Sequence, residues 1–131
     1  MKKLLVIMSH NMTKTQKEHA YNTLHISKII ECNIHIKNIW SNINPISSLD
    51  LSKLDIVIKW IKENTAQGDY VLVQGEFGAT FYIVDYCLKK GLIPIYATSK
   101  REVIEEINEE KIITNRIFKH ETFRKYVKYE E

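Results

Sequence analysis

Three short apolar runs constrain the fold of this 131-residue chain more than any other feature. They read KLLVIM at residues 3–8, YVLVQ at residues 70–74 and LIPIYA at residues 92–97. Continuous apolar runs of this length are typical of strands that are buried on both faces of a parallel sheet. Because parallel strands need crossover connections, the chain should alternate strands with helices.

The first half of the chain supplies two of these helices. The segment TKTQKEHAYNTLH predicts a polar helix that begins at Thr13, and LSKLDIVIKWIKEN, residues 51–64, has apolar residues at helical spacing. The segment KIIEC, residues 28–32, predicts a weaker strand, and IWSNINPISS, residues 39–48, predicts a loop because it is rich in Asn, Ser and Pro.

A further helix is expected over residues 77–90, between the second and third apolar runs, with Gly91 as its C-terminal cap. Its larger apolar residues recur at helical spacing and are expected to face inward: Phe77, Phe81, Val84 and Leu88.

The pattern changes from residue 101 onward. REVIEEI, residues 101–107, and KIITNRIFKHETFRKYV, residues 111–127, favour extended structure joined by a turn at NEEK, although REVIEEI is also compatible with a short helix. The whole chain, residues 1–131, therefore predicts a single α/β domain. We expect a small Rossmann-like open sheet, mainly parallel, with a C-terminal antiparallel extension.

Composition narrows the function classes. Hydrophobic residues make up 44% and charged residues 27% of the chain, which is ordinary for a soluble globular protein. The net charge of +3 permits an anionic ligand but is weak support for DNA binding, so no DNA partner is expected. The apolar start ends at Met8, too early for a signal peptide, and no segment approaches a membrane span; we expect a cytoplasmic protein.

No cofactor or metal is expected. Cys32 and Cys87 lack a disulfide framework, and the half-site spacing of Cys32 and His35 has no second pair to complete a zinc site. The loop QGEFGAT lacks the third glycine of a dinucleotide fingerprint and the Gly-Lys-Ser/Thr of a P-loop.

The fold class itself indicates where a ligand would lie. In open α/β sheets ligands bind beyond the carboxyl ends of the parallel strands. Gly75 and Gly78 would let the backbone approach an anion at a helix N-terminus, and Lys100 and Arg101 add full charges. The residues at the three predicted strand ends are Ser9, His10 and Asn11; Gln74, Gly75, Glu76, Phe77, Gly78, Ala79 and Thr80; and Thr98, Ser99, Lys100 and Arg101.

Several of these residues have simpler interpretations. The two glycines are also compatible with a tight turn and helix packing alone, and Glu76 can point to solvent, orient a hydroxyl or pair with Arg101. His10 is a candidate general base or acid, or a simple cap.

Other histidines and the tryptophans have structural interpretations of their own. His19, His25 and His35 read as helix-surface residues, and Trp40 and Trp60 as core residues, although Trp40 in a loop could stack on a base. The basic, aromatic tail can line a nucleotide groove or form a hairpin with one solvated face.

Four segments together resemble the small CRISPR-associated proteins of the Csx-twenty family: VIMSHNMTKTQ, IWSNINP, GDYVLVQGEFGATFYIVDYCLKKGLIPIYATSKREVIEE and RIFKHETFRKY. The resemblance implies a compact relative of the CARF domain of type III CRISPR systems. It implies a ring nuclease that cleaves cyclic tetra-adenylate and switches off the antiviral signal. It also implies a homodimer with the ring across the two-fold axis, which fits a domain too small to enclose four nucleotides.

The implied substrate carries its own nucleophile, the ribose 2′-hydroxyl, so cleavage needs positioning and charge stabilisation rather than a metal. Lys100 and Arg101 suit the stabilisation of the phosphorane. Ser9, His10 and Gln74 can position the hydroxyl or cradle the phosphate, and Gly75, Phe77, Gly78 and Ala79 can supply backbone donors.

The proton acceptor and the outcome of binding stay open. His10 is the main candidate for the acceptor, and His120 is another if the tail folds back over the ring. A module that only sequesters the ring and a subunit without any ligand remain the alternatives.

Overall fold

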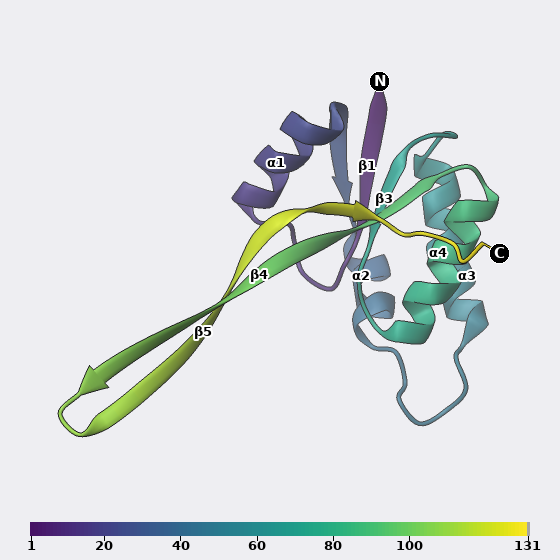
Figure 1. Ribbon diagram of the computed structural model, residues 1–131. Helices are drawn as coiled ribbons and strands as arrows, with labels where there is room; N and C mark the ends of the chain where they lie inside the picture. Colours follow the sequence, from purple (N-terminus) through teal and green to yellow (C-terminus); the bar gives the residue numbers. More distant parts are fainter. Residues whose placement is uncertain (131) are drawn as a thin grey trace.

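Within residues 1–130, which the computed structural model describes, five strands form one open sheet in the order β2-β1-β3-β4-β5 (Figure 1). The elements in chain order are β1 (Lys2–Ile7), α1 (Lys14–Leu24), β2 (Ile26–Glu31), α2 (Ile34–Ser41), α3 (Leu51–Asn64), β3 (Tyr70–Val73), α4 (Phe77–Lys89), β4 (Ile93–Asn108) and β5 (Lys111–Lys125). Strands β1 to β4 are parallel, and β5 pairs antiparallel with β4. The predicted α/β class, with a mostly parallel sheet and an antiparallel extension, is confirmed.

Helices cover both faces of the sheet, with α1 on one face and α2, α3 and α4 on the other (Figure 1). Strand β1 shows why its sequence is apolar throughout. Leu5 and Ile7 pack with the three-helix side, whereas Leu4 and Val6 pack with the α1 side, and none is more than 2% exposed. Both faces of this central strand are therefore core.

Local sequence signals account for the ends of several elements. Thr13 caps α1 as predicted, and α3 spans residues 51–64 as predicted. The buried face of α3 consists of Leu54, Val57 and Ile61, whereas Leu51 is 46% exposed. Cys87 is a small buried core residue, and desolvation by burial raises the pKa of its thiol to about 12.

Two sequence predictions are wrong in this region. Phe77 and Phe81 do not face inward, because their side chains are 93% and 74% exposed. Smaller residues, with Ile83, form the buried stripe of α4: Ala79, Ile83, Val84 and Cys87. Of the residues predicted to face inward, Val84 is buried, whereas the aromatic rings of Phe77 and Phe81 lie outside this stripe.

The segment predicted as a loop over residues 39–48 begins inside a helix. Asn33 caps the eight-residue helix α2, because its side chain accepts the Ile36 N–H at 2.9 Å. Trp40 therefore lies on a helix and is 3% exposed, so it belongs to the core and is not available for stacking on a base. Among the residues described, no helix is both long enough and apolar enough to cross a membrane.

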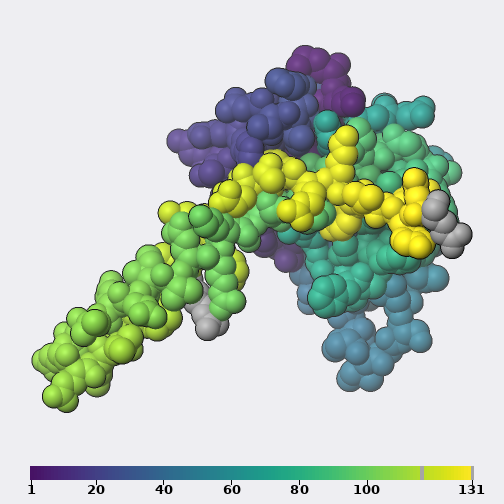
Figure 2. Space-filling model, in the orientation of Figure 1, coloured from purple at the N-terminus to yellow at the C-terminus, as the bar shows by residue number. Residues whose placement is uncertain are grey.

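The last two strands continue far beyond the sheet as a two-stranded ribbon (Figures 1 and 2). Residues 100–119 of this ribbon are called the arm below. The pairing runs out to Asn108 and Lys111, and Glu109 adopts a left-handed φ of 58° in the turn between them. REVIEEI is thus part of a strand, and the predicted turn at NEEK is confirmed.

Candidate functional site

The carboxyl ends of β1 and β3 lie at one edge of the sheet, beside the point where β4 passes beyond its parallel pairing with β3, and Gln74 joins the three strands. Its backbone N–H donates to the carbonyl oxygen of Ile7 at 3.1 Å, and its side-chain Oε1 accepts the Ala97 N–H at 2.8 Å. The residue that follows β3 is therefore bonded to both neighbouring strands. The Nε2 group of Gln74 remains as a side-chain donor.

A pocket of about 600 Å³ opens at this edge and is called the edge pocket below. It contains four of the predicted site residues, His10, Gln74, Thr98 and Ser99. The full lining is Met8, His10, Thr13, Thr15, Gln16, Gln74, Ala97, Thr98, Ser99, Phe118, Lys119 and His120. Segments far apart in the sequence thus form one polar hollow.

The N-terminus of α1 forms one wall of the edge pocket. Thr13 and Gln16 make a reciprocal capping box: the Gln16 N–H donates to Thr13 Oγ1 at 3.1 Å, and the Thr13 N–H donates to Gln16 Oε1 at 3.0 Å. No acidic residue lies in the first turn. The positive end of the helix dipole therefore faces the pocket with no carboxylate of its own to neutralise it.

The predicted anion site at the N-terminus of α4 has a different character. Glu76 is the N-cap of α4, and its own carboxylate accepts the Gly78 N–H. That carboxylate occupies the position an anion would take, so Glu76 serves the helix. Among the described residues, its carboxylate accepts no hydroxyl hydrogen bond and makes no ion pair with Arg101.

Gly75 has a packing role. A Cβ added there would lie 2.5 Å from Nε1 of Trp40, whose indole N–H donates to the Gln74 carbonyl oxygen at 2.8 Å. The simpler interpretation of this glycine, close packing after a strand, is the one that the geometry supports.

The predicted basic residues lie at the margin of the pocket. Lys100 and Arg101 follow Ser99 in β4 and start the arm, opposite Lys119 and Phe118 of β5. Lys119 is the basic side chain that lines the pocket, and its Nζ lies 3.2 Å from a Glu102 carboxylate oxygen.

The remaining predicted residues fall outside the pocket lining. Ser9 is exposed, and Asn11 Oδ1 accepts a hydrogen bond from Lys37 Nζ at 2.5 Å. On α4, Phe77 is exposed, Ala79 is fully buried in the core, and the Oγ1 atom of Thr80 is buried without a hydrogen-bond partner among the described residues.

His10 has the geometry of a proton acceptor. Its Nδ1 lies 3.1 Å from the carbonyl oxygen of Asn11, and a carbonyl can only accept, so Nδ1 carries the proton. In the neutral ring Nε2 then has a free lone pair. Because His10 also lines the pocket, this nitrogen can take a proton from a bound hydroxyl.

His120, which lines the edge pocket, forms a pair with His19 that the sequence did not reveal. His19 Nδ1 and His120 Nε2 are 2.8 Å apart, and the Phe123 ring lies 4.8 Å from the His120 ring. Desolvation by burial, with a smaller contribution from His19, lowers the pKa of His120, although Glu121 opposes the shift. The pair joins α1 to β5.

A β-bulge places this pair. Thr98 pairs with Thr122 and Ser99 pairs with His120, so Glu121 is an extra residue in β5. Without the bulge, His120 and Phe123 would point to opposite faces of the ribbon. His19 was expected on the helix surface, and no sequence signal marks the bulge that brings His120 to it.

The wall formed by Thr13, Thr15 and Gln16 was also missed, although a signal for it exists. A helix that follows the first parallel strand starts at the carboxyl edge of the sheet. The Thr-x-x-Gln capping pattern marks where α1 starts. The first turn of α1 could therefore have been named from the sequence.

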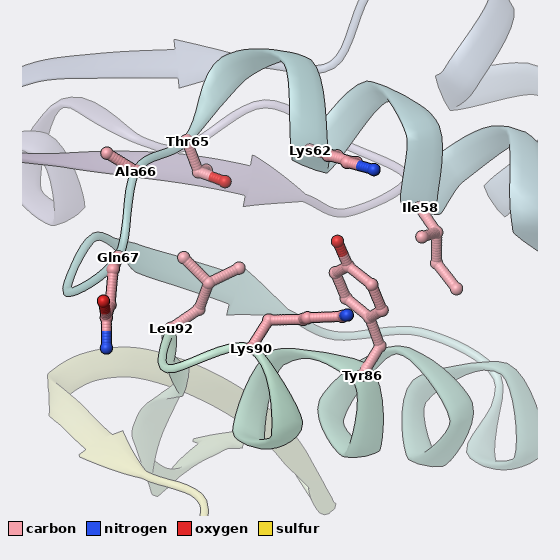
Figure 3. Close-up of a pocket in the computed structure, with 8 residues that line it drawn as sticks. All are labelled: Ile58, Lys62, Thr65, Ala66, Gln67, Tyr86, Lys90 and Leu92. Atoms are coloured by element: carbon pink, nitrogen blue, oxygen red, sulfur yellow. The ribbon is translucent and has the colours of Figure 1, made fainter.

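A second pocket, of about 330 Å³, lies at the opposite edge of the sheet between the C-terminal ends of α3 and α4 (Figure 3). Ile58 and Lys62 come from α3, and Tyr86 and Lys90 lie across from them. Lysines at helix C-termini complement the negative end of the helix dipole, so both charges have a structural explanation. This pocket contains none of the predicted site residues.

The fold and the edge pocket define a small α/β protein with an open, mostly parallel sheet and a polar pocket at its carboxyl edge. The chain belongs to the uncharacterized protein MJ1673 family, whose sequence model it matches over residues 2–124. A relative from Methanocaldococcus jannaschii, described as uncharacterized protein MJ1673, is 40% identical over 133 residues, which cover 98% of this chain and 100% of the relative. No solved structure matches the chain. Neither description names a ligand.

Proposed function

We propose that this protein is a cytoplasmic, CARF-like ring nuclease of the Csx-twenty kind, with a Rossmann-like domain. It binds cyclic tetra-adenylate and cleaves it, which switches off type III CRISPR antiviral signalling. One observation carries the proposal: the edge pocket combines a positive helix end, Lys119 and the free Nε2 of His10. Cleavage of a phosphodiester by its own 2′-hydroxyl requires these groups: positive charge at the phosphate and an acceptor for the hydroxyl proton.

The chemistry needs no metal. The ribose 2′-oxygen attacks the adjacent phosphorus, a 2′,3′-cyclic phosphate forms, and the bond from phosphorus to the 5′-oxygen breaks. His10 Nε2 accepts the 2′-hydroxyl proton, and the leaving 5′-oxygen takes a proton from solvent. The α1 N-terminus and Lys119 stabilise the phosphorane, with Lys100 and Arg101 at the margin.

The size of the pocket supports a homodimer. A volume of about 600 Å³ is typical of a site for one drug-sized ligand, and a ring of four nucleotides is larger than that. Part of the ring would then lie on a second copy of the chain, with the two edge pockets facing each other.

The test is a chromatographic assay of purified protein with cyclic tetra-adenylate in excess EDTA. We expect linear products that end in a 2′,3′-cyclic phosphate. A ring with 2′-methoxy groups should bind but resist cleavage, because the attacking oxygen is blocked. Cleavage of that analogue, or activity that needs added Mg²⁺ or Mn²⁺, would contradict internal attack.

A binding module that sequesters the ring without cutting it is the alternative. One observation favours it: Lys100 and Arg101, the two charges expected to stabilise the transition state, do not line the edge pocket. Time-resolved product analysis separates the two functions, because a sequestering module protects the ring from a second nuclease and releases it intact. If no cyclic oligoadenylate raises the melting temperature, both functions fail.

A further inference from the structure

The arm is the part of the molecule with the least support from the rest of the chain. It projects from the body as a long protrusion (Figure 2). An isolated two-stranded hairpin is marginally stable in water unless something covers one of its faces. An arm of this length therefore calls for a surface to pack on.

The arm exposes apolar side chains well beyond the scattered ones usual on a protein surface. Ile107 and Ile112 are cross-strand partners on one face, and they are 79% and 68% exposed. The other exposed apolar side chains of the arm are Val103, Ile104, Ile113, Ile117 and Phe118. Val103 and Phe118 share the face of Ile107 and Ile112, whereas Ile104, Ile113 and Ile117 lie on the opposite face of the ribbon. The first face is the more exposed of the two, and an exposed apolar face of this kind marks an interaction site.

The charge at the outer end of the arm, residues 102–113, which we call the outer arm, indicates what it binds. Residues 102–113 contain five glutamates and one lysine, a net charge of −4, whereas the whole chain carries +3. The body outside the arm, residues 1–99 and 120–131, carries +3, because the inner part of the arm contributes Lys100, Arg101, Arg116 and Lys119. The outer arm is complementary in charge to the body of its own kind, and a second copy of this chain is the partner that fits.

The body carries a matching apolar surface on α4 and the C-terminal segment, and we call it the α4 patch. Its exposed members are Phe77, Phe81, Val127 and Tyr129, each at least 74% exposed. A hollow of about 360 Å³ lies among Phe81, Val84, Leu88, Tyr126, Val127 and Tyr129. Its lining also contains Lys128 and Asp85, and the Asp85 carboxylate is paired with Lys89 Nζ at 2.9 Å. Exposed aromatic side chains beside an apolar hollow are typical of interface hot spots.

We propose that the arm of one protomer docks on the α4 patch of a second copy, and that the exchange is reciprocal. Nine residues in each strand make a ribbon about 30 Å long and about 10 Å wide, so one docked face covers about 300 Å². Reciprocal docking adds the α4 patch and gives each protomer about 600 Å², close to the roughly 800 Å² per partner of a standard interface. If only one arm docked, the area buried on each protomer would be about half of the area in the reciprocal arrangement. This proposal does not rest on the nucleotide.

The first test is the molar mass in solution without ligand, by light scattering and sedimentation. We expect a dimer of the wild-type chain. Ile107→Glu in the arm and Phe81→Glu in the α4 patch should each weaken dimerisation at least 10-fold. Ile34→Glu is the matched control, since Ile34 is 74% exposed at the start of α2, outside both surfaces. Melting temperatures within a few degrees of the wild type would show that all three variants fold.

The second test locates the contact. A photo-crosslinking residue at position 107, in a mixture of isotope-labelled and unlabelled chains, should give mixed cross-links to residues 77–90 or 126–129. A monomeric wild-type chain, a dimer that both glutamate variants leave unchanged, or cross-links from arm to arm would each overturn the proposal. Loss of nucleotide cleavage with the dimer intact would count against the proposed function alone.

Discussion

The N-termini of α1 and α4 differ in one respect that decides which of them can bind an anion. The first turn of α1 contains no acidic residue and lines the edge pocket, whereas Glu76 places its carboxylate on the Gly78 N–H at the start of α4. Both helices follow parallel strands at the same edge of the sheet. A helix N-terminus is thus a site for a ligand only when its own cap leaves the charge unneutralised.

The sequence, by contrast, favours the start of α4 over the start of α1 as the anion site. Gly75 and Gly78 make the α4 loop resemble a phosphate-binding turn, yet Gly75 accommodates Trp40. The TKTQ segment at α1 contains no glycine and attracted no functional interpretation. Glycines near a helix start are therefore a weaker guide than the charge of the cap.

The largest expected effect tests whether the α1 side carries the chemistry. Replacing His10 with alanine should slow turnover of cyclic tetra-adenylate by about 100-fold and leave its affinity nearly intact, because the proton acceptor is lost but the phosphate contacts remain. Single-turnover kinetics and equilibrium binding measure the two quantities. His35→Ala, an exposed histidine on α2, is the control. An equal loss of affinity would make His10 a contact residue.

The second effect tests the structural role of the α4 loop. Gly75→Ala should lower the free energy of unfolding by about 1 to 3 kcal/mol, because the new methyl group overlaps the buried Trp40 ring. Gly78→Ala should change it by less than about 1 kcal/mol, since the added Cβ meets the flexible end of Glu76 at 3.1 Å and Cδ2 of Leu49 at an ordinary contact distance of 3.8 Å. Chemical denaturation of both variants makes the comparison. Similar stabilities would remove the packing explanation for Gly75.

The third effect sharpens the comparison of the two caps. Thr13→Ala and Glu76→Ala should each lower the free energy of unfolding by about 1 kcal/mol, because each removes an N-cap acceptor. Thr13→Ala alone should also weaken binding of cyclic tetra-adenylate, since Thr13 lines the edge pocket. Calorimetric titration of both variants measures this. Weaker binding by Glu76→Ala would return the site to α4.

The smallest effect concerns pH. The pKa of His120 is lower in the folded chain than its ordinary value of 6.5, so the folded state resists protonation that the unfolded state accepts. The stability contribution is complete above about pH 6.5 and is lost as the pH falls toward the folded pKa. His120→Phe should reduce the pH dependence of the free energy of unfolding by the equivalent of no more than one proton per molecule. His35→Ala should leave this pH dependence unchanged. Urea midpoints between about pH 7 and about pH 5 measure the slope.

The sheet and most of its helices could be predicted from the sequence because their signals are local. The apolar runs of β1 and β3, the Thr13 cap and the helix over residues 51–64 each depend on a few consecutive residues. The inward face of α4 could not be predicted, because two apolar stripes compete and the sheet accepts the smaller side chains.

About a third of the predicted site residues reach the edge pocket, and the reason lies in connectivity. His10 and Gln74 follow the parallel strands β1 and β3, and Thr98 and Ser99 lie in β4 just past its parallel pairing with β3, so all four reach the same edge of the sheet. Lys119 reaches the pocket only through the register of β4 and β5, and His120 only through the bulge at Glu121.

The sequence by itself determined the α/β class, the strand runs and the edge at which polar residues gather, since hydrophobic periodicity and parallel connectivity specify them. Only the tertiary structure decided which helix end faces the pocket, that Gly75 accommodates Trp40, and that His19 lies 2.8 Å from His120. The physical reason is the distance along the chain between the residues that make contact. The two histidines are 101 positions apart in the chain, and a contact of that kind depends on packing and strand register, which no local pattern encodes.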